Sequence, residues 1–157
     1  MPGNVSPPPL AMMQIGLLRG VDQLIGALGG DAAALLERAR IDAAALTDRH
    51  AMVPFASMAG LMERAARSLD CPDFGMRLAA VQGRDGASGP LYVAMRHSET
   101  LGAALAYAAD HTGASTSGTT MSLEHNREQR TAFLRFAVIA PGPIGGQKQV
   151  LEHGLTL

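Results

Sequence analysis

Cysteine is almost absent from this chain: Cys71 is the only one among 157 residues, so no internal disulfide can form. Such sparing use of cysteine is typical of a reducing compartment. Residues 1–18 lack the basic start of a signal peptide, and no apolar run approaches the roughly 20 residues that a membrane span needs. From these absences we expect a cytoplasmic protein that does not enter a membrane.

Aromatic residues are scarce as well, at 4% of the chain, and tryptophan is missing. Hydrophobic residues nevertheless account for 47% of the sequence, far more than a disordered protein contains. A chain of this length is typical of one domain that buries a sizeable core. We therefore expect the core to consist mainly of leucine, alanine, methionine, valine and isoleucine.

An excess of positive charge is also missing, since 13 basic and 14 acidic side chains leave a net charge of −1. Nucleic-acid binding draws most of its affinity from basic side chains that contact phosphates. Because no cluster of lysines and arginines occurs along the chain, the sequence argues against DNA binding by this chain alone.

The first two-thirds of the chain carry a helical hydrophobic pattern, after a flexible, proline-rich leader at residues 1–9. The pattern predicts a first helix over residues 10–28. Asp31 and Asp42 have the residue type and position of N-caps for two short helices that follow. Further helices are predicted from Pro54 to Leu69, from Phe74 to Val81 and from Leu91 to Met95, and then one that Ser98 caps, with Leu101, Leu105 and Ala108 facing inward.

The period then changes to alternation, which predicts an antiparallel hairpin with strands near residues 115–125 and 130–140. The second strand is apolar on both faces, with Phe136 on one and Phe133 on the other. We therefore expect this strand to be central and covered on both sides. A last helix is predicted from about Ile144. The fold class is thus α+β, with a mostly helical N-terminal two-thirds, an antiparallel β-hairpin and a C-terminal helix.

The end of the sequence lies inside this last helix, without a C-cap, and two strands are few for a stable sheet. We therefore expect residues 10–157 to form one domain that is incomplete at its C-terminus. The upstream helices can cover one face of the apolar strand, and the other would be covered by the terminal helix that begins near Ile144, by a partner chain or by sequence beyond Leu157. We therefore expect either a homodimer or a continuation of the chain past Leu157.

The five histidines give no sign of a metal site, because no two of them share a helix face at a spacing of three or four residues. A zinc site needs three or four converging ligands. We therefore predict no metal, no cofactor and solvent-exposed histidines. Cys71 precedes Pro72 in a helix-breaking turn, which favours a structural thiol over a nucleophile, and no catalytic residue is predicted.

Arg135 is the most interesting single residue, because the alternation places it on one strand face with Phe133. A buried arginine needs a partner, which is either an anionic ligand or a neighbouring carboxylate in an ion pair, unless the side chain extends to solvent. The structural alternatives are favoured, because they explain most charged strand residues. Arg77 presents the same choice on its short helix. Tyr92 and Tyr107 are either ligand contacts or core residues. The candidate ligand-binding residues are therefore Arg77, Tyr92 and Arg135.

Three segments of the chain stand out together. The first is an acidic, leucine-containing turn before the helix that begins at Val53-Pro54. The second is PDFGMRL at residues 72–78, and the third is GPL at residues 89–91 followed by SETL at residues 98–101. In this order and spacing they resemble the arabinose-binding-type N-terminal domain of AraC-family transcription regulators, over residues 15–157.

The resemblance implies a sensor domain that binds a small-molecule effector or mediates dimerisation, followed by a C-terminal pair of helix-turn-helix units. Contact with DNA is expected only through those units, which do not occur in these 157 residues. A ligand-free dimerisation module is the alternative function, and a small enzyme is the third. A closed, mostly apolar pocket of about 300 Å³ or more would favour an effector, whereas clustered titratable groups with strongly shifted pKa values would favour an enzyme.

Residues 1–157 alone should bind DNA at most weakly, without sequence preference and with strong salt sensitivity, because no basic recognition helix is predicted. Fluorescence anisotropy with labelled duplexes, at low and at physiological salt, measures this. Specific binding at nanomolar protein concentration and physiological salt would contradict the prediction.

Overall fold

A computed structural model of the protein describes residues 10–48, 50–84, 89–126, 128–140 and 144–157. Most of the elements in these ranges are helices, and the strands form two antiparallel pairs. In order the elements are β1 (Met12–Gln14), the 3-10 helix η1 (Ile15–Leu18), α1 (Val21–Ala27), α2 (Ala32–Ala39), η2 (Ala43–Thr47), β2 (Met52–Pro54), α3 (Phe55–Ser68), α4 (Phe74–Arg84), α5 (Gly89–Arg96), α6 (Leu101–His111), η3 (Thr112–Ala114), β3 (Thr119–Asn126), β4 (Thr131–Val138) and α7 (Gln147–Thr156). The predicted α+β class is confirmed.

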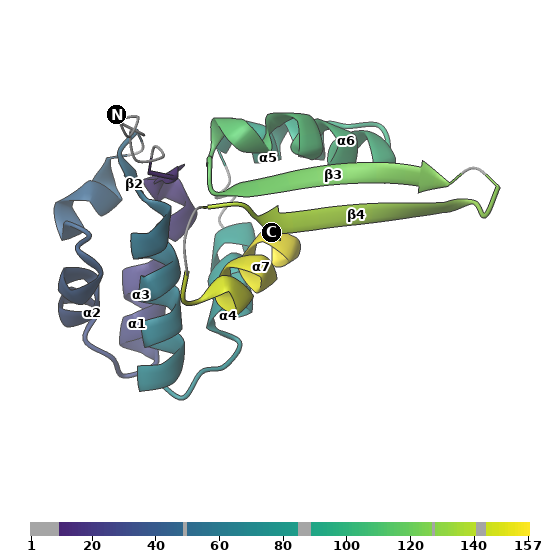
Figure 1. The fold of residues 1–157 in the computed structure, drawn as a ribbon. Coiled ribbons are helices and arrows are strands. Elements are labelled where there is room, and N and C mark those ends of the chain that lie inside the picture. The colour runs from purple at the N-terminus through teal and green to yellow at the C-terminus, as the bar shows by residue number, and fades with distance from the viewer. Residues whose placement is uncertain (1–9, 49, 85–88, 127, 141–143) are drawn as a thin grey trace, which may run out of the picture.

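Helices α1 to α4 and α7 form a bundle, and the β3–β4 hairpin projects from one end of it (Figure 1). Helices α5 and α6 run along β3, whereas α7 lies beside the base of β4. The core sits in the bundle and in the segment that leads into it, and its largest fully buried apolar side chains include Met13, Ile15, Leu18, Ile25, Phe55, Leu61, Met62, Phe74 and Leu78. None of the helices in the described ranges is both long and apolar enough to cross a membrane.

The predicted helix over residues 10–28 is wrong in its first part, where β1 pairs with β2 through Met13 and Val53. On its other edge β1 is bonded to a segment much later in the chain, since Ser117 N donates to Met12 O at 2.9 Å. Only η1 and α1 are helical in this region. Pairing with distant segments thus overrides the local helical pattern.

The next helices begin close to where their N-cap signals predict. Asp31 caps α2 by accepting a hydrogen bond from Ala34 N at 3.0 Å, and Asp42 caps η2 by accepting one from Ala44 N at 2.9 Å. Pro54 immediately precedes α3, so this helix begins one residue later than predicted. Local capping chemistry therefore fixes these boundaries, because it depends on neighbours in the sequence.

The start of α6 differs from its prediction. Thr100 caps this helix, with its Oγ1 accepting from Ala103 N at 3.1 Å, whereas Ser98 Oγ turns back and donates to a carbonyl of α5. Because the helix begins later than predicted, Leu101 points to solvent and is 75% exposed instead of facing inward. Ala108 is buried as predicted.

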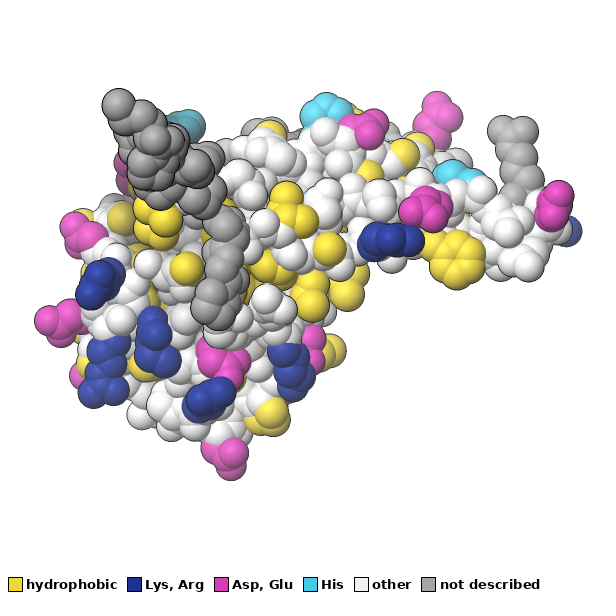
Figure 2. Space-filling model, in the orientation of Figure 1, with side chains coloured by type: hydrophobic (Ala, Val, Ile, Leu, Met, Phe, Trp, Pro, Cys, Tyr) yellow, Lys and Arg dark blue, Asp and Glu magenta, His cyan; other side chains and the backbone are white. Residues whose placement is uncertain are grey.

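The predicted hairpin is confirmed, with Met121 opposite Phe136 and Glu124 opposite Phe133. The expectation that its second strand is central is wrong, since β3 and β4 form a two-stranded sheet in the described part of the chain. The face with Met121 and Phe136 turns toward α6 and α7, whereas Phe133 and Ile139 on the other face are each 58% exposed. Figure 2 shows apolar side chains gathered where the hairpin leaves the bundle, while charged side chains spread over the bundle surface.

Helix α7 docks on α4 through a close backbone contact and buried hydrogen bonds. A Cβ atom at Gly75 would collide with the backbone oxygen of Gln149, so glycine is needed where the helices meet. Gln149 Oε1 accepts from Gly75 N at 2.8 Å, and Gln149 Nε2 donates to Pro72 O at 2.9 Å. The buried amide of Gln149 is thereby satisfied on both of its ends.

Replacing Gly75 with Ala should lower the free energy of unfolding by about 2 to 3 kcal/mol, because α4 and α7 would have to separate. Urea denaturation followed by circular dichroism measures the change. The matched control is Gly83→Ala on the exposed side of the same helix, where a Cβ atom meets nothing within 4 Å. The control should be neutral or stabilising by up to about 1 kcal/mol, and equal losses in both variants would contradict the described docking.

Candidate functional site

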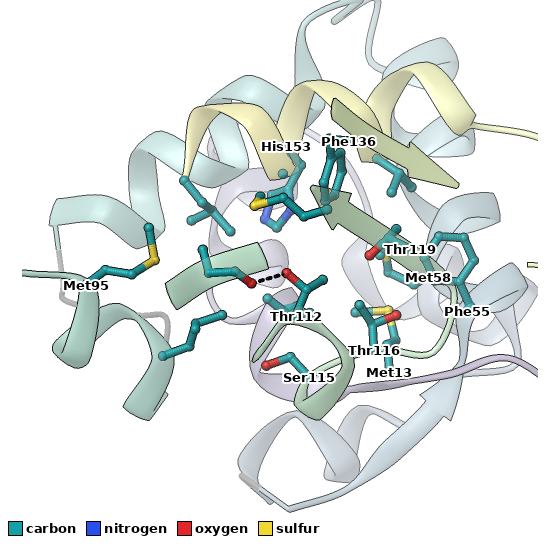
Figure 3. Close-up of a pocket in the computed structure, with 17 residues that line it drawn as sticks. Met13, Phe55, Met58, Met95, Thr112, Ser115, Thr116, Thr119, Phe136 and His153 are labelled. Carbon is teal, nitrogen blue, oxygen red and sulfur yellow. Dashed lines mark hydrogen bonds between the residues drawn. The ribbon is translucent and has the colours of Figure 1, made fainter. Parts of the chain in front are cut away.

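A cavity of about 130 Å³ lies where the base of the hairpin meets the helical bundle (Figure 3). Its walls come from β1, η1, α3, α5, α6, β3, β4 and α7, so segments from the whole length of the chain contribute to it. The cavity therefore exists only when the hairpin and the bundle are packed together.

Methionines give the cavity adaptable walls. Methionine is unbranched and changes its side-chain conformation easily, which suits surfaces that accept ligands of different shape. One side is closed tightly, because a Cβ atom at Gly154 of α7 would lie 2.5 Å from the ring of Phe136. The methionines on the other sides are Met13, Met58, Met95 and Met121.

Threonine hydroxyls line part of the cavity, and two of them are satisfied within the chain. Thr112 Oγ1 donates to Ala108 O at 2.6 Å, and Thr116 Oγ1 accepts from Gly118 N at 3.0 Å. Thr119 differs, because its Oγ1 is buried and finds no hydrogen-bond partner among the described residues. A buried polar group without a partner costs roughly 1–3 kcal/mol. An occupant of the cavity could supply the missing bond.

His153 of α7 is the other notable polar group at the cavity. Its Nε2 lies 2.8 Å from Gln82 Oε1, and Gln82 Nε2 donates to Leu17 O and Arg19 O at 3.0 Å each. Because the amide nitrogen of Gln82 is committed to two carbonyls, its oxygen must accept, and His153 Nε2 must donate. His153 Nδ1 then keeps its lone pair. Burial lowers the pKa of His153 to about 4, so the ring is neutral at pH 7.

The chemistry of this cavity suits the binding of an apolar molecule. None of the described residues that line it is an aspartate, glutamate, lysine or arginine. In the described ranges, no three side chains of the metal-binding types histidine, cysteine, aspartate and glutamate are grouped as a metal site requires. Pockets of this kind bind through apolar contact and take their specificity from a few fixed polar groups.

The predicted candidate Arg77 lies away from the described cavity lining, on the exposed side of α4. Its Nε donates to both carboxylate oxygens of Asp73 at 3.0 Å, and this bond lowers the pKa of Asp73. Burial raises the pKa of the neighbouring Cys71 thiol, which donates to Asp73 Oδ1 at 3.4 Å. A buried thiol with a raised pKa is a poor nucleophile, in line with the structural role that the sequence favours.

Arg135 lies on the outer face of the hairpin, where its Nη2 is 3.5 Å from Glu124 Oε1 and its side chain is 70% exposed. Of the two alternatives that the sequence leaves open, the geometry favours the ion pair. Tyr107 is 38% exposed and stacks on His111 with ring centroids 4.0 Å apart. The side chain of Tyr92, in α5, lies outside the described residues. Neither arginine is brought into the cavity.

The sequence patterns did not identify Thr119 and His153 as candidate site residues. The prediction that the histidines are exposed is wrong for His153, which is only 4% exposed. Its partner Gln82 is 71 residues away in the chain, and local spacing does not reveal such a pair. One usable signal exists, because His153 shares a helical stripe with the apolar Val150 and Leu157. A histidine on such a stripe is expected to be buried and hydrogen-bonded.

Comparison with known proteins relates this chain to transcription regulators. A family model described as the arabinose-binding domain of AraC transcription regulators, N-terminal, matches residues 29–156. The HTH-type transcriptional regulator VirS from two Mycobacterium tuberculosis strains, CDC 1551 / Oshkosh and ATCC 25618 / H37Rv, is 38% identical over 84 residues. The match covers 54% of this chain and 24% of each relative, so the chain spans about a quarter of their length.

The stability of the protein should fall by about 3 kcal/mol as the pH is lowered from 6.5 to 4, through His153 alone. The unfolded chain takes up a proton at this histidine near pH 6.5, whereas the folded protein does so only near a pKa of about 4. Between these values the unfolded state binds more protons, so acid favours unfolding. Urea denaturation at several pH values measures the slope.

The variant His153→Gln isolates the contribution of His153. It should remove most of the pH dependence of the free energy of unfolding between pH 6.5 and 4. The control is His97→Gln at an exposed position, which should leave the slope as it is in the unmodified protein. Parallel pH profiles for the unmodified protein and His153→Gln would show that His153 is not buried and neutral.

Proposed function

This chain belongs to the family of N-terminal arabinose-binding domains of AraC transcription regulators, and from this we propose that it is a cytoplasmic sensor domain that binds a small-molecule effector. The observation that carries the proposal is a mostly apolar cavity with one buried, unpaired hydroxyl, that of Thr119. We further propose that the domain controls a C-terminal DNA-binding domain of the helix-turn-helix type. The similarity to VirS, which is an HTH-type transcriptional regulator, supports that part.

The family name does not assign a sugar as the effector. A sugar carries a hydroxyl on nearly every carbon, and each buried hydroxyl needs a hydrogen-bond partner. The described cavity walls are mostly apolar, and two of their threonines, Thr112 and Thr116, are already bonded within the chain. This composition supports an effector that is far less polar than arabinose.

Helix α7 is the element that would carry the signal. It lines the cavity through Val150, His153 and Gly154, and it also packs on α3, α4 and β4. An occupant that changes the position of α7 would therefore change its packing on the bundle. Signal transfer requires an element with two arrangements of similar energy, and a helix shared by the cavity and the bundle can supply one.

A second candidate function is a dimerisation module that binds no ligand. The cavity volume of about 130 Å³ favours it, since it is below the roughly 300 Å³ of ordinary ligand pockets. The exposed Phe133 and Ile139 on the outer face of the hairpin also favour it, because exposed apolar groups often mark interfaces. The two functions are compatible, and we propose a homodimer whose effector cavity lies on the other side of the hairpin from that face.

Filling the cavity separates the two functions. Ala108 of α6 is 2% exposed and lines the cavity, so Ala108→Met should occupy part of its volume and abolish the response to an effector. The free energy of unfolding should change by less than about 2 kcal/mol. The measurement is transcription from the target promoter by the full-length regulator, with and without a compound selected by thermal shift.

The matched control is Ala106→Met on the exposed side of the same helix, which should leave the response unchanged. If Ala108→Met folds, forms the same oligomer and still responds fully to the compound, the cavity is not the effector site. If no metabolite changes the stability of the unmodified protein, the dimerisation module is the better function.

A further inference from the structure

We propose that the effector is a small, neutral, mostly apolar molecule with a single hydroxyl group, about the size of phenol. The proposal rests on the function proposed above and names the chemical class that the same cavity selects. Size, charge and hydrogen bonding each restrict this class independently.

The size of the cavity favours a small occupant. Its volume is about 130 Å³, and apolar cavities of roughly 150 Å³ in other proteins bind benzene. Rotation of the lining methionines, Met95 and Met121 among them, would add some space without a change of the backbone. One six-membered ring or a short branched chain therefore fits, whereas a fused ring system or a nucleotide does not.

Charge excludes the ionised relatives of such a molecule. No lysine or arginine occurs among the described residues that line the cavity, and His153 is neutral at pH 7. A carboxylate buried there would lose its hydration without gaining a countercharge, which is strongly unfavourable. A primary ammonium group would likewise find no carboxylate among the described lining residues. The occupant is therefore uncharged.

The unpaired hydroxyl of Thr119 favours an occupant that carries a hydroxyl group. Thr119 is 6% exposed, and its Oγ1 lacks a partner among the described residues although it lies at the cavity. Thr119 of β3 and His153 of α7 both line the cavity (Figure 3). His153 Nδ1 can only accept a hydrogen bond, because Nε2 is the donor to Gln82. A hydroxyl group can both donate to and accept from the hydroxyl of Thr119, so it can supply the missing bond in either direction.

The test uses three probes with one benzene ring each: phenol and toluene, which have nearly the same shape, and the slightly larger, charged benzoate. Binding to the purified protein is measured by isothermal titration calorimetry and by thermal shift at pH 7. We expect phenol to bind about tenfold more tightly than toluene, because one hydrogen bond at a buried site is worth about that factor. Benzoate should not bind. Thr119→Val should bind toluene as tightly as the unmodified protein does and lose the preference for phenol.

Matched variants separate this effect from damage to the fold. Thr120→Val changes the exposed neighbour on the other strand face and should keep the preference, and Thr119→Ser retains a hydroxyl and should restore it. Thr119→Val should also raise the melting temperature of the empty protein, because a methyl group replaces an unpaired buried hydroxyl. A structural role of Thr119 predicts the opposite change.

Each outcome bears on the proposal. Equal binding of phenol and toluene, or binding of benzoate, would overturn the proposed class while leaving effector sensing by this cavity intact. No binding of any probe would also overturn the class, and the Ala108→Met reporter experiment would still test effector sensing independently. An unchanged preference for phenol in Thr119→Val would show that Thr119 does not contact the hydroxyl.

Discussion

The hydrogen bond between His153 Nε2 and Gln82 Oε1, 2.8 Å long and buried, connects α7 to α4. Gln82 Nε2 in turn donates hydrogen bonds to Leu17 O and Arg19 O, at 3.0 Å each, near the start of the described chain. Gln82 and His153 are both buried, so each needs the other to satisfy its hydrogen bonds. The orientation of the imidazole ring depends on this bond, which together with the hydrogen bonds of Gln149 holds α7 on α4. Removing one partner would leave the other buried without a bond.

The cavity combines two features that rarely occur together in a core that serves stability alone. Its walls are apolar and adaptable, yet Thr119 presents a buried hydroxyl without a partner among the described residues. Valine has the same shape as threonine and would remove the cost of the unpaired group. A local departure from the rule that buried polar groups are bonded is expected where a ligand completes the bond. An occupant would touch both the hairpin and α7, which connects the fold to the proposed sensor function.

The sequence predicts the parts of this fold that depend on neighbouring residues. The caps at Asp31 and Asp42, the stripes of α2 to α4 and the hairpin follow from local spacing, and the structure confirms them. The errors involve distant partners. Residues 12–14 form a strand because β2 and residues 115–117 bond to them, and β4 is exposed because helices cover one face of a two-stranded sheet. The cavity could not be predicted for the same reason, since no single segment contains its polar groups.

The protonation state of the His153 ring decides most directly which hydrogen bonds this residue can make. Nitrogen-15 NMR of the histidine rings in the purified protein reports which nitrogen carries the proton. The arrangement around Gln82 predicts a neutral ring at pH 7, protonated at Nε2 only, whose signals do not change between pH 8 and 5.5. A ring protonated at Nδ1, or one that titrates near pH 6.5 like an exposed histidine, would contradict both the bond to Gln82 and an acceptor at the cavity.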